Sequence, residues 1–450
     1  MKSPRSQRGA VALVVALVLI IGMTMVVFYA NRGMIFEQRA SANQYRATRA
    51  FELAEAGLEW AVARLNDDLF INSACANPGV NGNPVTNTFR ERYLAVSSGA
   101  TASFVINTSN PPHAACSVDA AGVATCSCPA SGTSPTLNAP TDGRFSVRFG
   151  PDPGGDPLAI EIVSYGCTNQ GAPCDPGSTA TPDATAVVRA LYKVRSKFPS
   201  VPGAGLVAGS AATAGGNLNV VNLDVKSNGI TINSGTTVEL GSGTNVFTLP
   251  GTPPRASILD NDFALTALTR ADDNGDLYFQ SFFGETQAQY QNNPQTWVIT
   301  GGNCGSRVRC TSCSTAAGCG SAVSSAIDNG VVQFWAETPV QFGSGNLPAV
   351  GTLGTAARPI SFAGSSGIEL RSNITAYGLF FVATATATDN WDYNGSGTAK
   401  VYGSIVSRGD FVKGSGTLDV IYDANIFRAG ESTGVLVRVP GSWRDKETSY

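Results

Sequence analysis

Hydrophobic residues fill one long stretch near the N terminus without a charge among them. The run extends from Ala10 to Ala30 and, as a helix, spans about 30 Å, the thickness of a bilayer's hydrocarbon core. The residues before it include Lys2, Arg5 and Arg8 and no acid. Because an excess of cations holds a flank in the cytoplasm, the pattern predicts a single membrane span with an exported body.

Helical periodicity continues beyond the apolar run. Apolar residues recur mostly at steps of three, four and seven, and charged residues occupy the opposite face, which is typical of a helix lying on a sheet. No proline interrupts the chain between Pro4 and Pro78, and Asn66-Asp67-Asp68 is expected to end the helix. We predict one helix of about 60 residues and about 90 Å. The apolar face consists of Phe36, Ala40, Ala47, Phe51, Ala54, Leu58, Ala61 and Leu65.

Two-residue alternation predicts antiparallel strands in the next region, over residues 144–149, 158–166 and 185–194. Residues 71–140 are rich in Asn, Pro, Ser, Gly and Cys, and we expect them to be loop-like. Residues 31–198 would therefore form a module in which the helix packs on a small antiparallel sheet.

A second module is predicted after Pro199 to Pro202. From residue 203 to 450, short apolar alternations recur every seven to ten residues between Asn-Gly and Ser-Gly turns, which indicates a β-solenoid or a β-sandwich. Gly-Ser-Gly-Thr occurs at 241, 395 and 414, and the strands 399–405 and 418–422 follow the last two. The 19-residue spacing of these two copies is near one coil of a β-helix. The predicted fold class is α+β with a Gly-rich all-β module.

The residues at the start of the apolar run distinguish three kinds of N-terminal segment. A secretory signal has a shorter apolar region, and the small-residue site Ala40-Ser41-Ala42 lies well beyond this one. A plain uncleaved anchor fits, but it does not explain why Gly9 stands between Arg8 and the run.

The sequence Gln7-Arg8-Gly9-Ala10 followed by the apolar run resembles the class III leader of type IV pilins and pseudopilins. The block Arg49-Ala50-Phe51-Glu52-Leu53-Ala54-Glu55-Ala56-Gly57-Leu58-Glu59 is similar to the PilX-type pilin-assembly subgroup. The resemblance covers about the first 70 residues. It implies residues 1–9 as a leader, cleavage after Gly9 by a prepilin peptidase, methylation of Ala10, and residues 10–30 as the span. The residues that it implies on the assembly helix are Val14, Phe36, Glu37, Phe51, Glu55 and Leu58.

Val14 departs from the pattern of major pilins. Most pilins place a Glu at this fifth mature position, where it is thought to neutralise the terminal amine of a neighbouring subunit. An uncompensated amine in an apolar bundle is costly, so the chain is better suited to a minor subunit. The resemblance thus implies a non-enzymatic subunit at the tip or in the initiation complex of a pilus, anchored in the inner membrane. Its partners would be other minor pilins, the major pilin and a tip adhesin. A K-type pseudopilin of type II secretion shares the missing Glu, although its extra domain is expected to be helical.

Ten cysteines in an exported chain are expected to form disulfides rather than to bind metal. Cys167 and Cys174 flank a short loop between two predicted strands, and a bridge there is sterically reasonable. Cys310 and Cys313 have a zinc-like spacing, but no His lies nearby, and we expect local disulfides among Cys304, Cys310, Cys313 and Cys319.

Candidate chemistry is sparse. The net charge of -3 and the pI near 5.4 argue against nucleic-acid binding, and no phosphate-binding loop is present. His113 is the only histidine, so a catalytic base has one weak candidate. Asp272-Asp273-Asn274-Gly275-Asp276 begins like a calcium loop but lacks its later ligands, and a solvated turn is the stronger interpretation. We expect no cofactor and no enzyme activity; the alternative is a membrane-anchored β-helical adhesin or polysaccharide-acting enzyme.

Overall fold

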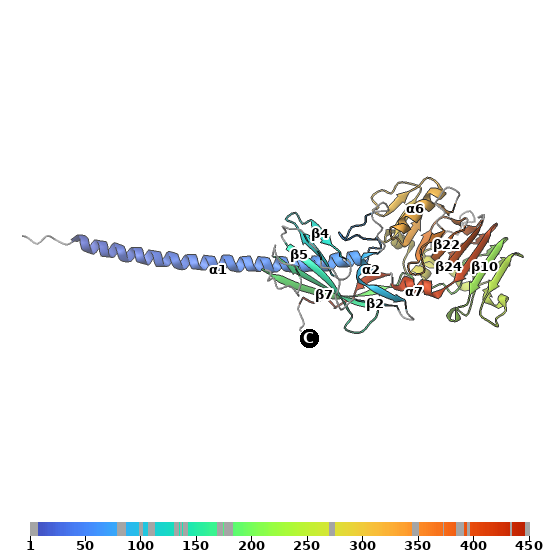
Figure 1. Ribbon diagram of the computed structural model, residues 1–450, viewed down its shortest axis with the longest axis horizontal. Coiled ribbons are helices and arrows are strands. Elements are labelled where there is room, and N and C mark those ends of the chain that lie inside the picture. Colours follow the sequence, from blue (N-terminus) through green and yellow to red (C-terminus); the bar gives the residue numbers. More distant parts are fainter. Residues whose placement is uncertain are drawn as a thin grey trace, which may run out of the picture.

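A long helix projects from a β-rich body in the computed structural model (Figure 1). The helix α1 (Arg8–Leu65) has 58 residues and ends directly before Asn66, which confirms the predicted length and end. The structure describes residues 8–78, 87–98, 102–106, 113–129, 135, 137, 143–168, 174, 183–269, 275–343, 351–371, 373–383, 391–393, 397–432 and 434–445.

The second half of α1 packs on an antiparallel sheet with the strand order β27-β7-β6-β5-β3-β4. Strands β5, β6 and β7 confirm the predicted meander, and Val147 pairs with Ser164 while Ile162 pairs with Ala190. A short helix and a hairpin lie beside the sheet. The bounds are α2 (Phe89–Tyr93), β1 (Ala95–Ser98), β2 (Ala102–Val105), β3 (Ala114–Val118), β4 (Ala124–Ser127), β5 (Gly143–Pro151), β6 (Ala159–Cys167), β7 (Thr185–Arg195) and β27 (Val435–Arg438).

The expectation of a loop over residues 71–140 was wrong for part of this region. It contains α2 and the strands β1 to β4, and Cys116 pairs with Cys126 across the β3–β4 ladder. All five residues of β3 are buried, so the strand shows no alternation of polar and apolar positions. A sequence of small residues without that alternation gives no strand signal.

The second module is a parallel β-helix. Of the two predicted alternatives, the β-solenoid is therefore correct and the β-sandwich is wrong. Its strands form three rows, in which all paired neighbours are parallel; in the third row β21 and β23 are in contact but belong to two separate sheets. The first row is β19 (Thr352–Leu353), β22 (Thr375–Val382), β24 (Thr398–Ser407), β26 (Thr417–Tyr422), β10 (Asn217–Asn222) and β13 (Thr244–Phe247). The second is β16 (Cys310–Ser312), β15 (Trp297–Thr300), β17 (Gln333–Ala336), β20 (Ile360–Gly364), the C-terminal parts of β22 and β24, β8 (Leu206–Ala208), β11 (Ile232–Ser234) and β14 (Ile258–Leu259). The third is β18 (Val340–Phe342), β21 (Ile368–Leu370), β23 (Trp391–Tyr393), β25 (Phe411–Lys413), β9 (Ala212–Ala214) and β12 (Val238–Leu240).

The 19-residue spacing of the Gly-Ser-Gly-Thr repeat equals the offset between paired residues on two adjacent strands, β24 and β26. Thr398 pairs with Thr417 and Ala399 with Leu418 on adjacent strands. Inside the β-helix, the rings of Phe334, Phe362 and Phe380 stack at centroid distances of 5.9 and 6.3 Å. Equivalent residues of successive coils therefore fill the same layer of the core.

The coils do not follow one another in chain order. The first coil, β8 to β10, lies between the second coil, β11 to β13, and the last coil, β24 to β26. After β14 the chain crosses to the other end of the β-helix, from which it winds back. Helices and short helical turns connect the strands of the β-helix. Their bounds are η1 (Val225–Ser227), η2 (Pro254–Ser257), α3 (Phe263–Leu268), α4 (Asp276–Phe283), α5 (Gln287–Asn292) and α6 (Ala316–Asp328).

The end of the chain returns to the first module. After α7 (Ala424–Ser432), β27 pairs with β7 antiparallel, with Leu436 opposite Val194. The predicted division at residue 203 therefore places β27 in the wrong module, because an edge strand four residues long gives no sign of its distant partner.

Candidate assembly helix and module junction

The first half of α1 contacts nothing else in the described structure. Val14 is 59% exposed and Phe36 is 68% exposed, and Glu37 is exposed as well. Gly9 and Ala10 lie in the first turn of the helix. The helix contains a window of mean hydropathy 3.0 with none of its surface buried, so by length and composition it can cross a membrane. An apolar surface of this size needs a membrane or other helices to cover it.

The second half of α1 is fixed on the sheet through one face. Leu53, Leu58 and Leu65 are buried there, whereas Glu55 points to solvent. Phe51 is half-buried and meets Trp443 edge to face, with ring centroids 6.3 Å apart. The predicted assembly residues thus form two groups. Those at residues 14–37 are exposed, and those at residues 51–58, except Glu55, pack within the protein's own core.

Glycines allow the helix and the sheet to approach closely. A methyl group added to Gly166 of β6 would overlap the backbone carbonyl of Ala50 and the backbone amide of Ala54. A methyl group added to Gly57 would overlap Ser164 and the ring of Phe145. The Ala-Glu-Ala-Gly-Leu-Glu block therefore has a packing role in addition to its resemblance to a family.

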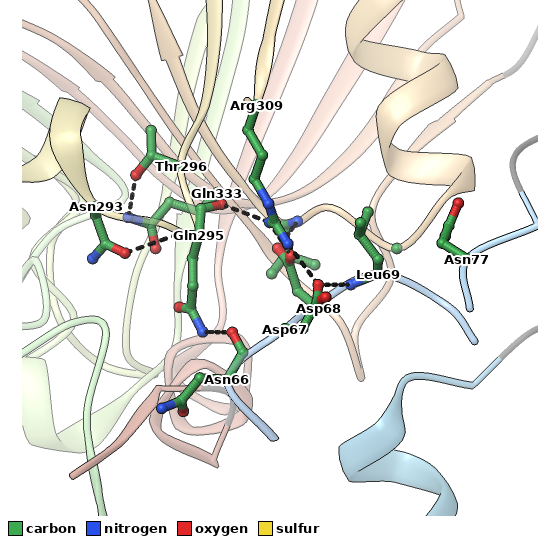
Figure 2. A network of polar contacts seen from close by, with 12 residues as sticks. Asn66, Asp67, Asp68, Leu69, Asn77, Asn293, Gln295, Thr296, Arg309 and Gln333 are labelled. Carbon is green, nitrogen blue, oxygen red and sulfur yellow. Dashed lines mark hydrogen bonds and ion pairs between the residues drawn. The ribbon is translucent and has the colours of Figure 1, made fainter. Parts of the chain in front are cut away.

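The residues directly after α1 dock on the β-helix. We call Asn66 to Phe70 the junction segment. Asp67 and Asp68 both form ion pairs with Arg309 (Figure 2). Asp68 also accepts a hydrogen bond from the backbone amide of Val332 at 3.2 Å. The amide of Gln295 donates to the carbonyl of Asn66 in the same network. These contacts join the C-terminal end of α1 to the β-helix.

Two further arginines connect α2 with its surroundings. Arg90 donates to the carbonyl of Leu65 at 2.9 Å and to the carbonyl of Gly434 at 2.8 Å. Arg358 of the β-helix pairs with Glu91, donates to the carbonyl of Gly330 at 2.6 Å and lies over the ring of Phe70. Bidentate and charge-assisted bonds of this kind fix geometry more strongly than neutral ones.

Burial and charge act in opposite directions on these groups. Burial lowers the pKa of Arg90 to about 10, although Asp68 and Glu91 oppose that shift. Burial also lowers the pKa of Arg309, but Asp68 and Asp67 outweigh it and the net shift is upward. The junction is therefore a partly buried network in which Arg309 pairs with Asp67 and Asp68 and Arg358 pairs with Glu91.

Asn66 also supports the returning edge strand. Its side-chain amide donates to the carbonyl of Leu436 at 3.0 Å and its side-chain oxygen accepts from the amide of Leu436 at 2.8 Å. One residue thus contacts both β27 and, through its own carbonyl, the β-helix. Sequence reasoning took Asn66 only as a helix stop.

All ten cysteines form disulfides. Cys167 is bonded to Cys174, as predicted, and the candidate cluster forms the pairs Cys304–Cys310 and Cys313–Cys319. The remaining pairs are Cys75–Cys128 and Cys116–Cys126. Within the residues that the structure covers, no group of three or more His, Cys, Asp or Glu is arranged to hold a metal ion. Asp272 to Asn274 lie outside the described residues, and Asp276 accepts a hydrogen bond from the amide of Gln287.

Sequence reasoning missed the arginines of the junction. Arg90, Arg309 and Arg358 lie in segments with no periodic pattern and are far from their partners in sequence. A weak signal was present, because Arg358 and Arg309 are among few charged residues in a module dominated by Gly, Ser and Thr.

A long helix, bare and apolar in its first half and packed on an antiparallel sheet in its second, is the architecture expected of a pilin-like protein. The family model described as PilX N-terminal matches residues 8–59, which confirms the resemblance to PilX-type minor pilins at the N terminus. No curated protein matches the chain. Among solved structures, the competence-associated pilin ComZ from Thermus thermophilus is similar at 12% identity and a TM-score of 0.22, covering 89% of this chain and 97% of that one.

Proposed function

We propose that this protein is a non-enzymatic minor pilin of the PilX type, cleaved after Gly9 and incorporated at the tip or in the initiation complex of a type IV pilus. The match of residues 8–59 to the PilX N-terminal family carries the proposal. The exposed apolar half of α1 supports it, since this surface must be covered first by the inner membrane and then by the helices of other pilins.

Two features favour an end position over the shaft. Val14 offers no carboxylate to the terminal amine of a neighbour, and an unpaired amine in an apolar bundle is unfavourable. The β-helix is attached at the opposite end of α1 from the leader, held by the junction network, and would widen the fibre wherever the subunit was inserted. Displayed at a tip, the same body is available to other minor pilins, to a tip adhesin or to a surface.

Mass spectrometry of the mature N terminus tests the processing step. We expect a chain that begins with N-methylated Ala10. An intact Met1, or a cut near Ala42, would contradict the pilin proposal and favour an anchored β-helical adhesin or polysaccharide-acting enzyme.

Immunogold labelling of sheared pili tests the position. With the unmodified protein, label should be confined to the fibre ends. Regular label along the fibre shaft would show that neither Val14 nor the β-helix determines the position of the subunit. A K-type pseudopilin would instead be absent from pili and would copurify with a type II secretion complex.

A further inference from the structure

A cavity of about 190 Å³ lies beside the junction, between the two modules. Arg195, at the end of β7, and Lys197, two residues later, line one side of the cavity. Val435 and Val437 line it from β27, and Gln333 and Ser361 line it from the β-helix. Arg195 and Val437 are exposed, so this side of the cavity reaches the surface. The volume is enough for several water molecules or one small solute.

The Lys197 ammonium group is buried and has no hydrogen-bond partner in the described structure. The polar side chains that line the cavity bond to one another and not to Lys197. The hydroxyl groups of Ser361 and Tyr290 bond to each other at 2.8 Å, and Gln333 donates to Thr296 at 2.7 Å. A buried ammonium group without a partner is unfavourable because it has lost its hydration, so this position calls for an acceptor.

The charges around Lys197 do not supply that acceptor. Three cations, Arg90, Arg309 and Arg358, act on it, and Asp68 is the acid that opposes them. Asp68 is already engaged by Arg309 and by the amide of Val332. Burial raises the pKa of Glu285 at the cavity wall, and Arg195 opposes that shift. Positive charge is therefore in excess on the Lys197 side of the cavity.

We propose that this cavity binds a small oxyanion, of the size of a carboxylate or inorganic phosphate, through the ammonium group of Lys197. The bound anion balances the local excess of positive charge and satisfies the Lys197 donors. Because the cavity is walled by β7, β27 and the β-helix, the anion ties the returning end of the chain to both modules. The proposal is independent of the role in a pilus.

Thermal unfolding of the full chain in detergent tests the site. The unfolding midpoint is measured at pH 7 in sodium phosphate, sodium acetate and sodium chloride at equal ionic strength. For a chain of 450 residues, a ligand at about ten times its dissociation constant should raise the midpoint by about 1.5 °C. We expect that rise with phosphate or acetate and not with chloride. The same midpoint in all three salts would overturn the proposal and indicate that the cavity holds water only.

A pair of variants locates the effect. In Lys197→Met the midpoint should no longer respond to the anion, whereas Lys193→Met should respond as the parent does. Lys193 lies four residues earlier, on β7, and its side chain is 52% exposed and pairs with Asp156. An unchanged response in Lys197→Met would also refute the site.

A second measurement does not depend on a variant. The ³¹P resonance of inorganic phosphate should broaden in the presence of the parent protein, and excess acetate should reverse the broadening. Burial lowers the pKa of Lys197 to about 8, so the broadening should also fade as the pH is raised above that value. Phosphate that keeps a sharp resonance at pH 7 would exclude binding.

Discussion

Replacing Arg309 with Met should uncouple the two modules. The side chain of Arg309 is 15% exposed, and those of its partners Asp68 and Asp67 are 8% and 21% exposed. Removing one partner of a buried ion pair costs about 3–5 kcal/mol, because the other partner keeps its desolvation cost without compensation. Since Asp67 retains some contact with water, we expect a loss of about 3 kcal/mol, near the lower bound of that range.

The matched control is Arg307→Met. Arg307 lies two residues earlier in the same loop and pairs with Glu337 at 2.9 Å, but these side chains are 40% and 29% exposed. An exposed pair contributes at most about 1 kcal/mol. Urea unfolding of the full chain gives the two free energies. Hydrogen exchange locates the effect, because the amides of Phe70 and Val332 bond across the junction and should lose protection only in the Arg309 variant.

Equal losses in the two variants, or a loss below about 0.5 kcal/mol in Arg309→Met, would refute the reasoning, since such values are those of surface positions. A triple variant, Arg309→Met with Asp67→Asn and Asp68→Asn, should recover part of the stability because it also removes the uncompensated charges. Further loss in the triple variant would show that the carboxylates act through their hydrogen bonds rather than through the ion pairs.

Three other changes have distinct expected results. In thermal unfolding, Gly166→Ala should lower the unfolding free energy by about 3 kcal/mol, because the new methyl group would overlap the backbone of α1. The control Gly150→Ala, whose nearest contact would be 3.9 Å away, should change it by less than about 1 kcal/mol. In anion-free buffer the parent should gain stability as the pH rises from about 8 to about 10, by at most about 3 kcal/mol, and Lys197→Met should not. The pKa of Lys197 in the folded chain, about 8, lies below its ordinary value of 10.5, so the unfolded chain binds more protons in that range. Gly9→Val should leave an unprocessed membrane precursor, and mature-length protein in sheared fibres would contradict this.

Local pattern was enough to predict the elements whose information lies in neighbouring residues. The periodic spacing from Phe36 to Leu65 gave α1 with its end at Asn66, and alternation gave β5, β6 and β7. The Gly-Ser-Gly-Thr repeat gave the true register of β24 and β26, because a β-helix places equivalent residues of adjacent coils side by side.

Features that depend on distant pairing could not be read from the sequence. β27 is too short to reveal β7 as its partner, and nothing in the first coil indicates that it lies against the last one. The junction arginines bond to carboxylates and carbonyls about 240 to 340 positions away, so only the tertiary structure brings them together. The assembly helix was predicted as one surface, and burial divided it because residues 51–58 also belong to the protein's own core.

Under the proposed export, the order of the coils has a consequence for how the chain matures. The side chain of Asn219 bonds to Asp419 at 2.6 Å, across 200 positions, because the first coil is placed between the second and the last. A chain that emerges N terminus first cannot close its β-helix in step with translocation, and its earliest strands keep an open edge until about residue 422 has crossed. The unpaired edge of a parallel sheet pairs slowly with strands that are distant in sequence, and until then it is prone to associate with other chains. We therefore expect the newly exported protein to depend on periplasmic chaperones, and to become resistant to proteases in a single late step rather than coil by coil.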